Sequence, residues 1–358
     1  MRWARWDRPR RAHVLRRRTL ASWTETWRTA KENRLFVPRG DARATAPPHP
    51  REGESRFHVT RTSPVRQRPF YLLTENCLDA SYLIVDWLSQ LRHAEGFRGI
   101  LVRDAPDRRT WAEKVAFHRR HSGRTRLSPD EVQELLGLYS NSSGYSAMPG
   151  FAEASVALYG VPEYPEPAAG ESLPIRFIGQ DLNTPELFAW VDDITAGDAR
   201  PVLFIWLSKI LKQRWIDAFD GWIINSHPAV LPYARGMWAI EQVVMEGVPE
   251  NVRRCAGASV HFVDAGIDTG DIIRVAGIDP FQSRTLPELS ARVLRLATRM
   301  LVRTARSLAE HPEEHLRGVP VDPRLLGPNY KNKDFDEPAA AERAVNSFER
   351  MLAHVVRS

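Results

Sequence analysis

Short apolar runs alternate along this chain with segments whose apolar residues recur at helical spacing. The run PFYLLT (69–74) comes first, a helical pattern follows from Asp79 to His93, and GILV (99–102) is the next run. Strand, helix and strand in this order open a parallel α/β sheet, because parallel strands need a crossover between them. The alternation therefore predicts an α/β fold, with a mostly parallel Rossmann-like sheet and helices on both faces.

The same alternation continues over the rest of the chain. Further strands are predicted at 155–161, 174–178, 201–207, 222–227, 259–264 and 271–276. Helices are predicted at 109–120, 128–138, 184–194, 209–218, 236–247, 286–310 and 338–356. The charged segment 105–150 interrupts the order, and we expect it to be an insertion able to cap a site.

Basic residues are concentrated at the N-terminus. Residues 1–66 hold 17 Arg and Lys against six Asp and Glu, a local charge of +11, although the whole chain carries only +6. The Pro-, Arg- and His-rich stretch 46–68 has few apolar residues to bury and is predicted to be a linker. We therefore expect a basic leader and linker at 1–68, poorly ordered in part, a folded domain at 69–310 and a C-terminal extension at 311–358.

Several interpretations of this leader stay open. Its charge attracts nucleic acid, an anionic membrane or an acidic protein, but it contains no recognisable nucleic-acid recognition module. A solvated tail and a misassigned start codon are simpler explanations. No run approaches the roughly 18 apolar residues that cross a bilayer, so no membrane partner is expected. Because Cys77 and Cys255 are the only cysteines, we expect no disulfide framework and a cytoplasmic location.

The segment IINSHPAVLPYARG (223–236) delivers polar side chains from the end of an apolar strand. Ligands of α/β sheets bind at the carboxyl ends of strands, and alternate residues of a strand point to one side, so Asn225 and His227 should face a common site. An amide beside an imidazole suits stabilisation of an oxyanion and proton transfer. The alternative is that the Asn and His only cap the turn before Pro228.

A second segment, SVHFVDAGIDTGDII (259–273), ends a strand in a loop that carries Asp268. Its glycines permit tight turns close to a ligand. The Asp268 carboxylate is placed to orient His227 and raise its pKa, or to accept a proton through water. The alternative here is a simple hairpin turn, in which Asp and Gly are the usual residues.

Together the two segments resemble the folate-dependent formyltransferases of the glycinamide ribonucleotide transformylase-like fold. That family has an Asn-x-His-Pro-x-x-Leu-Pro segment, and its catalytic Asp stands seven residues after the His of a Val-His-Phe-Val-like strand. This chain has HPAVLP at 227–232, and Asp268 stands seven residues after His261. FIWLSKIL (204–211) lies where the family holds the pterin ring. The resemblance covers roughly residues 170–310.

The resemblance implies that 10-formyltetrahydrofolate is the formyl donor, that an amine is the acceptor and that no metal is needed. Asn225 and protonated His227 would stabilise the oxyanion, and Asp268 would orient His227 and help to move the amine proton. We expect His261, which lies in mid-strand, to be structural. The residues implied to bind the folate are Ser208, Lys209, Ile210, Leu211, Val263, Asp264 and Gly266.

Departures from the family pattern narrow the acceptor. The first turn, TENCLDAS (74–81), has no Gly, so a phosphate cradle there is doubtful. After the last core helix the 48 residues 311–358 are too few for the barrel of methionyl-tRNA formyltransferases. In form, LPYARG (231–236) and GIDTGDII (266–273) are nearest to sugar N-formyltransferases and methionyl-tRNA formyltransferases.

We therefore expect the acceptor to be a small-molecule amine, an amino sugar or an amino acid derivative, in natural product biosynthesis. Hydrolysis of the formyl donor and formylation of an aminoacyl-tRNA or a carrier-bound amine are the alternatives. Arg235 and Tyr233 are candidates for binding the acceptor; for Arg235 a salt bridge at a helix start is equally consistent with the pattern. Segment 327–335 either closes over the site or forms a surface tail, and we favour the tail. The oligomeric state is not predicted.

Overall fold

The computed structural model describes most of the chain after the basic leader. The described residues are 67–103, 111–139, 148–166, 173–197, 200–311, 316–335 and 338–355. Residues 1–66 lie outside this range, and so do the parts of the insertion and of the C-terminal extension that fall in its gaps. None of the described helices is both long and apolar enough to cross a membrane.

A seven-stranded sheet forms the centre of the described fold, in the order β3-β2-β1-β4-β5-β7-β8. The first five strands in this order are parallel, whereas β7 runs antiparallel to β5 and β8 antiparallel to β7. The mostly parallel α/β fold is therefore confirmed. The strands are β1 (Phe70–Glu75), β2 (Phe97–Arg103), β3 (Ile175–Ile178), β4 (Val202–Trp206), β5 (Ile223–His227), β7 (Gly257–Phe262) and β8 (Ile272–Gly277).

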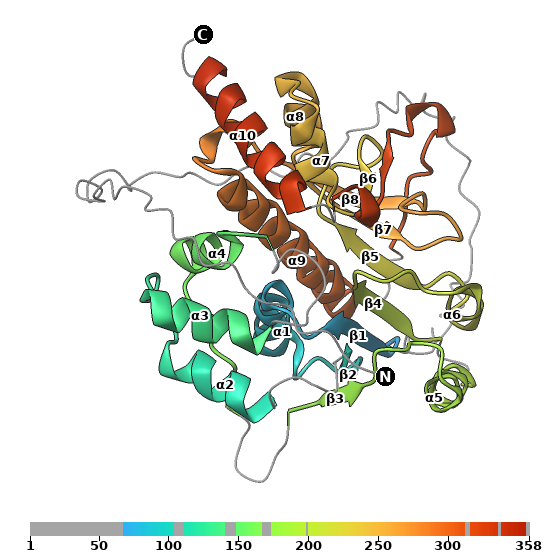
Figure 1. Cartoon of the computed structure of the whole chain (residues 1–358). Helices are drawn as coiled ribbons and strands as arrows, with labels where there is room; N and C mark the ends of the chain where they lie inside the picture. The colour runs from blue at the N-terminus through green and yellow to red at the C-terminus, as the bar shows by residue number, and fades with distance from the viewer. Residues whose placement is uncertain are drawn as a thin grey trace, which may run out of the picture. The chain divides into compact units, whose positions relative to one another are not determined.

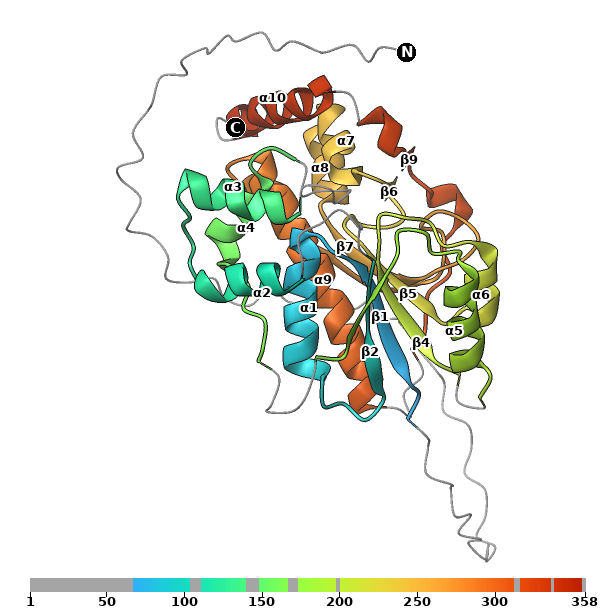
Figure 2. The same ribbon diagram turned by 60° about the horizontal axis from the view of Figure 1, so that its bottom comes forward.

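Helices cover both faces of the sheet, as the sequence predicts. α1 (Leu78–Leu91) and α9 (Leu286–Glu310) pack on one face, and α5 (Pro185–Thr195) and α6 (Gln213–Ala218) on the other (Figures 1 and 2). The period of two in the strands explains the two layers. Leu72 is buried in the core beneath α1 and α9, whereas its neighbour Leu73 is buried beneath α5 and α6. The continuous apolar runs are therefore central strands that are covered on both sides.

Helix α9 follows the predicted range because its ends are encoded locally. Thr285 is its N-cap, and the Thr285 hydroxyl accepts a hydrogen bond from the N–H of Glu288 at 3.2 Å. Thr184 caps α5 in the same way, through the N–H of Leu187 at 3.3 Å. A capping residue followed by apolar side chains at helical spacing thus determines where each of these two helices begins.

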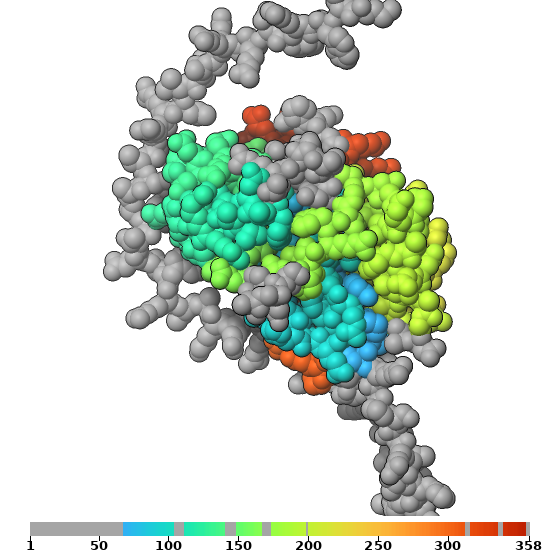
Figure 3. All heavy atoms as spheres, turned by 90° about the horizontal axis from the view of Figure 1, so that it is seen from below, coloured from blue at the N-terminus to red at the C-terminus, as the bar shows by residue number. Residues whose placement is uncertain are grey.

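The described part of the insertion 105–150 contains the two predicted helices, and a third helix follows it directly. α2 (Trp111–Arg120) and α3 (Pro129–Leu138) confirm the charged helical segments, but the strand predicted at 155–161 is wrong, because α4 (Phe151–Tyr159) occupies most of it. Phe151, Ala152, Ser155 and Val156 are its buried residues, which is helical spacing. Figure 3 shows the insertion in teal on one side of the face seen from below, and α5 and α6 in yellow-green on the other.

Two predicted helices begin later than their sequence pattern suggests. The helix predicted at 209–218 starts only at Gln213, so 208–212 form a loop after β4. In the predicted helix 236–247, Gly236 belongs instead to a short strand, and α7 (Ala239–Met245) starts after it. Both loops line the cavity described below. Helix α8 (Pro249–Cys255) was not predicted.

The C-terminal extension packs against α7 and pairs with the segment before it. α10 (Pro338–Val355) contacts α7, and the two-residue strand β9 (Asn329–Tyr330) pairs in parallel with β6 (Arg235–Gly236). The surface tail favoured from the sequence at 327–335 is therefore wrong. Three single-turn helices complete the described elements: η2 (Pro280–Gln282), η3 (Pro323–Leu325) and η4 (Asn332–Asp334).

Candidate active site

The end of β5 brings polar side chains from neighbouring strands into one row. Asn225 is paired with Ile205 of β4 on one side and with His261 of β7 on the other, and all three line one cavity. His227 faces the same cavity from the same strand, whereas the hydroxyl of Ser226 donates to the Ala297 carbonyl of α9 at 2.9 Å. The prediction that Asn225 and His227 share a side is thus confirmed.

The imidazole of His227 is buried and held from two directions. Its Nε2 lies 3.0 Å from the Ala234 carbonyl oxygen and donates to it, while Nδ1 lies 3.5 Å from Oδ2 of Asp268. Burial lowers the pKa of His227 more than the neighbouring Asp268 raises it, and His261 and Arg235 also lower it. Burial therefore outweighs the increase of this pKa that was expected from Asp268.

Asp268 lies on a loop with a left-handed backbone, at φ 51°. Its Oδ2 accepts the N–H of Gly236 at 2.8 Å, and its Oδ1 lies 3.5 Å from Nε2 of His261. Burial alone would raise the pKa of Asp268, but the neighbouring His227 and His261 and the Gly236 hydrogen bond hold it well below its usual range. Asp268 is therefore a buried carboxylate that stays ionised between two histidines.

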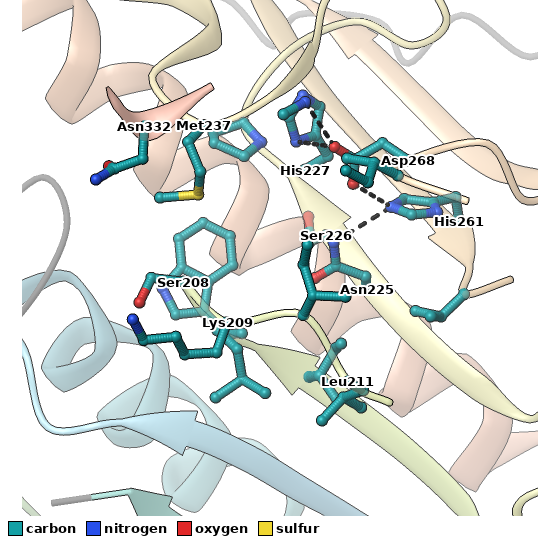
Figure 4. Close-up of a pocket in the computed structure, with 18 of the residues that line it drawn as sticks. Ser208, Lys209, Leu211, Asn225, Ser226, His227, Met237, His261, Asp268 and Asn332 are labelled. Atoms are coloured by element: carbon teal, nitrogen blue, oxygen red, sulfur yellow. Dashed lines mark hydrogen bonds and ion pairs between the residues drawn. The ribbon is translucent and has the colours of Figure 1, made fainter. Parts of the chain in front are cut away.

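His261 belongs to this group and is more than the structural residue expected from the sequence. Its Nδ1 donates to the Phe262 carbonyl oxygen at 2.8 Å, which leaves Nε2 to accept from Nδ2 of Asn225 at 3.2 Å. Figure 4 shows the resulting chain of contacts from Asn225 through His261 and Asp268 to His227. The missed signal was strand pairing, because β5 and β7 are antiparallel and place His261 directly opposite Asn225.

These four residues line a cavity of about 530 Å³. Its lining also contains every residue predicted to bind the folate: Ser208, Lys209, Ile210, Leu211, Val263, Asp264 and Gly266. The Asp264 carboxylate accepts from the Thr269 hydroxyl at 2.8 Å and from the Gly266 N–H at 3.0 Å, which fixes the loop after β7. The cavity thus joins two loops, 208–211 and 263–267, which we call the folate-type loops, to a polar row. The polar row consists of Asn225, His227, His261 and Asp268.

Two other walls of the cavity were not predicted as binding residues. One is the turn between β1 and α1, which contributes Glu75, Cys77 and Asp79. The other comprises Met237 and segment 329–332 of the C-terminal extension. In Figure 4, Met237 and Asn332 lie across the cavity from Ser208 and Lys209. In the part of the chain that the structure describes, no group of three His, Cys, Asp or Glu side chains is arranged to hold a metal.

The two residues predicted to bind the acceptor are not in the cavity lining. The Arg235 guanidinium donates to the carbonyl oxygens of Gly327 and Ile267, both at 3.1 Å. It therefore ties the C-terminal segment to the loop that carries Asp268. Tyr233 stacks instead beneath the guanidinium of Arg254, 5.2 Å from the ring centre. Both side chains have structural contacts, which the motif alone did not reveal.

Segment 327–335 is held firmly against α7. Nε1 of Trp238 donates to Oδ1 of Asn332 at 2.9 Å, and Nε2 of Gln242 donates to the Lys331 carbonyl at 3.1 Å. The rings of Trp238 and Phe335 stack with centres 4.7 Å apart, and the Tyr330 hydroxyl is hydrogen-bonded to Glu246. The segment is thus a fixed wall of the cavity.

Comparison with known proteins identifies the class of enzyme. The formyl transferase family model matches residues 190–305, which contain the whole polar row and both folate-type loops. The phosphoribosylglycinamide formyltransferase of Mycobacterium tuberculosis is 32% identical over 150 residues, which are 41% of this chain and 67% of that protein. The methionyl-tRNA formyltransferase of Rickettsia bellii is 30% identical over 107 residues, 30% of this chain and 34% of that protein.

Solved structures include a sugar N-formyltransferase from Shewanella, with a TM-score of 0.43 and 12% identity over 78% of this chain and 87% of that one. The 32% identity to the Mycobacterium tuberculosis enzyme, over two thirds of its length, shows that the chain belongs to the formyl transferase family. It is an enzyme that transfers formyl groups, with an α/β fold and a polar row at the strand ends.

Proposed function

We propose that this protein moves a formyl group from 10-formyltetrahydrofolate to the amine of a small molecule, an amino sugar or an amino acid derivative. The observation that carries the proposal is the continuity of one cavity. It is lined by Asn225, His227 and Asp268 and, on an adjoining wall, by the folate-type loops 208–211 and 263–267. Donor and reacting groups would therefore meet without crossing a protein wall.

The loop after β4 is suited to hold the pterin ring. Residues 208–211 belong to no helix or strand, so their peptide groups are not committed to regular secondary structure. Leu211 and Val263 add apolar surface on the same wall. A flat heterocycle with donors and acceptors on its edge is typically bound by such a combination of backbone groups and apolar side chains.

The polar row would promote attack of the amine on the formyl carbon. Nδ2 of Asn225 carries two hydrogens, of which one is donated to His261, and the other can stabilise the oxyanion. Neutral His227 would accept the proton that the attacking amine loses, and ionised Asp268 would stabilise the imidazolium so formed. His227 would then return the proton to the folate nitrogen as the carbon–nitrogen bond breaks.

This sequence of steps differs from the expected role of a protonated His227. The burial that lowers the His227 pKa favours the neutral ring before the amine attacks. The proton is therefore gained during the reaction. The described part of the extension 311–358 completes the cavity of the domain 69–310, so we assign both to one catalytic unit.

The proposal is tested by mass spectrometry with a formyl donor labelled in the formyl carbon. Incubation with candidate amines should add one labelled formyl group to the acceptor and release tetrahydrofolate in equal amount. Labelled formate released at the same rate without any acceptor would instead show hydrolysis of the donor. Failure with every small amine, but labelling of an aminoacyl-tRNA, would move the acceptor to that class.

A further inference from the structure

Most polar side chains that line the cavity are bonded to the protein itself. The hydroxyl of Ser208, for example, donates to Oε1 of Glu75 at 2.8 Å, and every member of the polar row has the partner given above. Among the described residues, three lining side chains with nitrogen or oxygen have no such partner: Lys209, Asn329 and Lys331. Polar groups that the fold leaves unused in a cavity are the first candidates for contacts with a ligand.

Exposure separates Asn329 from the two lysines. Lys209 and Lys331 are exposed, and an ammonium group in solvent needs no partner from the protein. Asn329 is half-buried, and its amide carries two donor hydrogens and an acceptor oxygen. An amide that is partly withdrawn from water loses hydrogen bonds unless the protein or a ligand supplies them. The lack of a protein partner in the described part of the chain is therefore informative for Asn329 and not for the lysines.

The backbone of β9 holds Asn329 in place. The carbonyl of Pro328 accepts from the N–H of Arg235 at 3.1 Å. On the other side of Asn329, the carbonyl of Tyr330 accepts from the N–H of Met237 at 3.0 Å. The backbone of Asn329 therefore cannot shift without breaking a bond to β6. A polar group on such a fixed backbone binds a ligand at a lower cost in entropy than one on a mobile loop.

The Asn329 amide lies directly beside the reacting groups. A Cβ added at Gly236 would lie 2.7 Å from Oδ1 of Asn329, so the amide packs over the Cα of this glycine. The N–H of Gly236 donates to Oδ2 of Asp268 at 2.8 Å. The amide and the carboxylate are thus in contact with the same glycine, and both line the cavity.

The place of Asn329 in the cavity favours contact with the acceptor over contact with the folate. Met237 and Asn332 belong to the same wall as Asn329. In Figure 4 both lie across the cavity from Ser208 and Lys209, which belong to a folate-type loop. Donor and acceptor must meet at the polar row, so a group on the wall that faces this loop is placed to contact the acceptor.

We infer that Asn329 binds the acceptor, with its amide hydrogen-bonded to polar groups at and beside the amine that is formylated. Oδ1 would accept from the amine, and Nδ2 would donate to an oxygen close to it. Amino sugars and amino acids both have such an oxygen, whereas simple alkyl amines do not. The inference rests on the proposed formyl transfer and narrows its acceptor to amines of this kind. Asn329 lies outside the residues 190–305 that match the family model.

Two variants of Asn329 separate hydrogen bonding from the filling of space. Asn329→Leu keeps nearly the same shape and removes the hydrogen bonds, whereas Asn329→Ala removes both. With the amine that takes up the labelled formyl group as acceptor, we expect KM to rise about tenfold in both variants and kcat to change little. A wild-type KM in Asn329→Leu would contradict the inference, because the side chain would then only fill space. An acceptor without an oxygen near its amine would contradict it as well.

Measurements without the acceptor detect structural damage. Calorimetry should give the wild-type Kd for tetrahydrofolate in both variants, and the melting temperature should stay near that of wild type. Asn346→Ala on α10, which replaces an exposed asparagine outside the cavity lining, is the matched control and should leave KM and kcat unchanged. A weaker Kd for tetrahydrofolate with an unchanged KM for the acceptor would show that Asn329 binds the donor, and the inference would be wrong.

Failure of the inference and failure of the proposed function give different results. If an amine takes up the labelled formyl group and Asn329→Leu leaves its KM unchanged, formyl transfer stands and the inference about Asn329 is wrong. If the labelled formyl group appears only as formate with every amine, the proposed function is wrong, and the inference fails with it.

Discussion

The two ends of the cavity are built from different parts of the chain. Asn225, His227, His261 and Asp268, which we call the reacting end, come from β5, β7 and the following loop, all within the residues 190–305 that match the family model. The β1–α1 turn, with Glu75, Cys77 and Asp79, and segment 329–332 line the rest of the cavity, and both lie outside that range. We call them the acceptor end, because the proposed function leaves them for the acceptor. We therefore expect the chemistry of the family and the choice of acceptor to be encoded separately.

Because the two ends come from different parts of the chain, similarity to relatives is informative about the reaction and less so about the acceptor. Identity to phosphoribosylglycinamide formyltransferases and methionyl-tRNA formyltransferases supports formyl transfer by this chain. It leaves the acceptor open, because the β1–α1 turn and segment 329–332 lie outside the residues 190–305 that match the family model. Variants at the reacting end should therefore lower kcat, whereas variants at the acceptor end should raise KM for the acceptor.

The largest effect is expected from Asp268→Asn. The amide oxygen can still accept from the Gly236 N–H, but the charge that would stabilise protonated His227 is lost. We expect kcat to fall by about 10²–10⁴-fold, the range for removing an electrostatic or acid–base group. Initial rates with saturating acceptor measure this effect. An unchanged binding constant for tetrahydrofolate, by calorimetry, would show that the fold is retained, and a kcat near wild type would contradict the assigned role.

Gly236→Ala should have the next largest effect, because it acts on both ends at once. Gly236 has φ +86°, and a Cβ there would overlap the Tyr330 carbonyl oxygen, so β6 and β9 must separate. The same N–H is donated to Asp268. We expect kcat/KM to fall about tenfold or more and the melting temperature to drop by several degrees. Gly247→Ala, which also has positive φ but meets only Ser347 Oγ at 3.7 Å, is the control for backbone strain.

The pH dependence of kcat/KM tests whether His227 at the reacting end acts in its neutral form. Burial lowers its pKa below the usual value of about 6.5, so the neutral form persists as the pH falls through that value. We expect kcat/KM, corrected for the fraction of unprotonated acceptor, to stay level through pH 6.5 and to decline only in more acidic buffer. A corrected rate that rises on acidification would instead indicate that protonated His227 is the active form.

The same shift predicts how stability changes with pH. Below about pH 6.5 the unfolded chain binds a proton at His227 that the folded protein does not, so the free energy of unfolding falls on acidification. Asp268 adds a further loss below about pH 4, because its folded pKa is depressed. Replacing His227 by Asn should reduce the first loss, measured as the change in melting temperature between pH 7.5 and 5.5.

The smallest effect is expected from Arg235→Lys. A single ammonium group cannot reach the carbonyls of both Gly327 and Ile267 as the guanidinium does, so the C-terminal wall should loosen. We expect KM for the acceptor to rise about threefold with little change in kcat, because partial loss of one positioning contact costs little. Steady-state kinetics with the acceptor identified by labelling measure this rise. A fall in kcat that exceeds the rise in KM would instead show that Arg235 acts at the reacting end.

Much of the fold was predictable because its signals are local. Thr285 and Thr184 cap the helices that were predicted at 286–310 and 184–194, and the apolar runs of β1, β4 and β5 mark strands covered on both faces. The strand predicted at 155–161 was wrong because its apolar residues, seen without those at 151 and 152, fit either period. Whether this segment forms a helix or a strand depends on how it packs against the rest of the fold.

The reacting end was predicted only in part, for a physical reason. Asn225, His227 and Asp268 follow from their motifs, but His261 and the position of Arg235 depend on which strands pair and on what the C-terminal segment contacts. These contacts join residues that are far apart in the chain, and no local pattern encodes them. The acceptor end was missed for the same reason, since β1 and segment 329–332 meet the cavity only after folding.

A double-variant cycle tests the separation of the two ends most directly. The measurement is kcat and KM for the acceptor identified by labelling, in wild type, Asp79→Asn, Asp268→Asn and the double variant. The account predicts that Asp79→Asn raises KM, that Asp268→Asn lowers kcat, and that the two effects multiply in the double variant. If Asp79→Asn lowers kcat as Asp268→Asn does, and the double variant is no worse than either single one, the two ends act as one unit and the account is wrong.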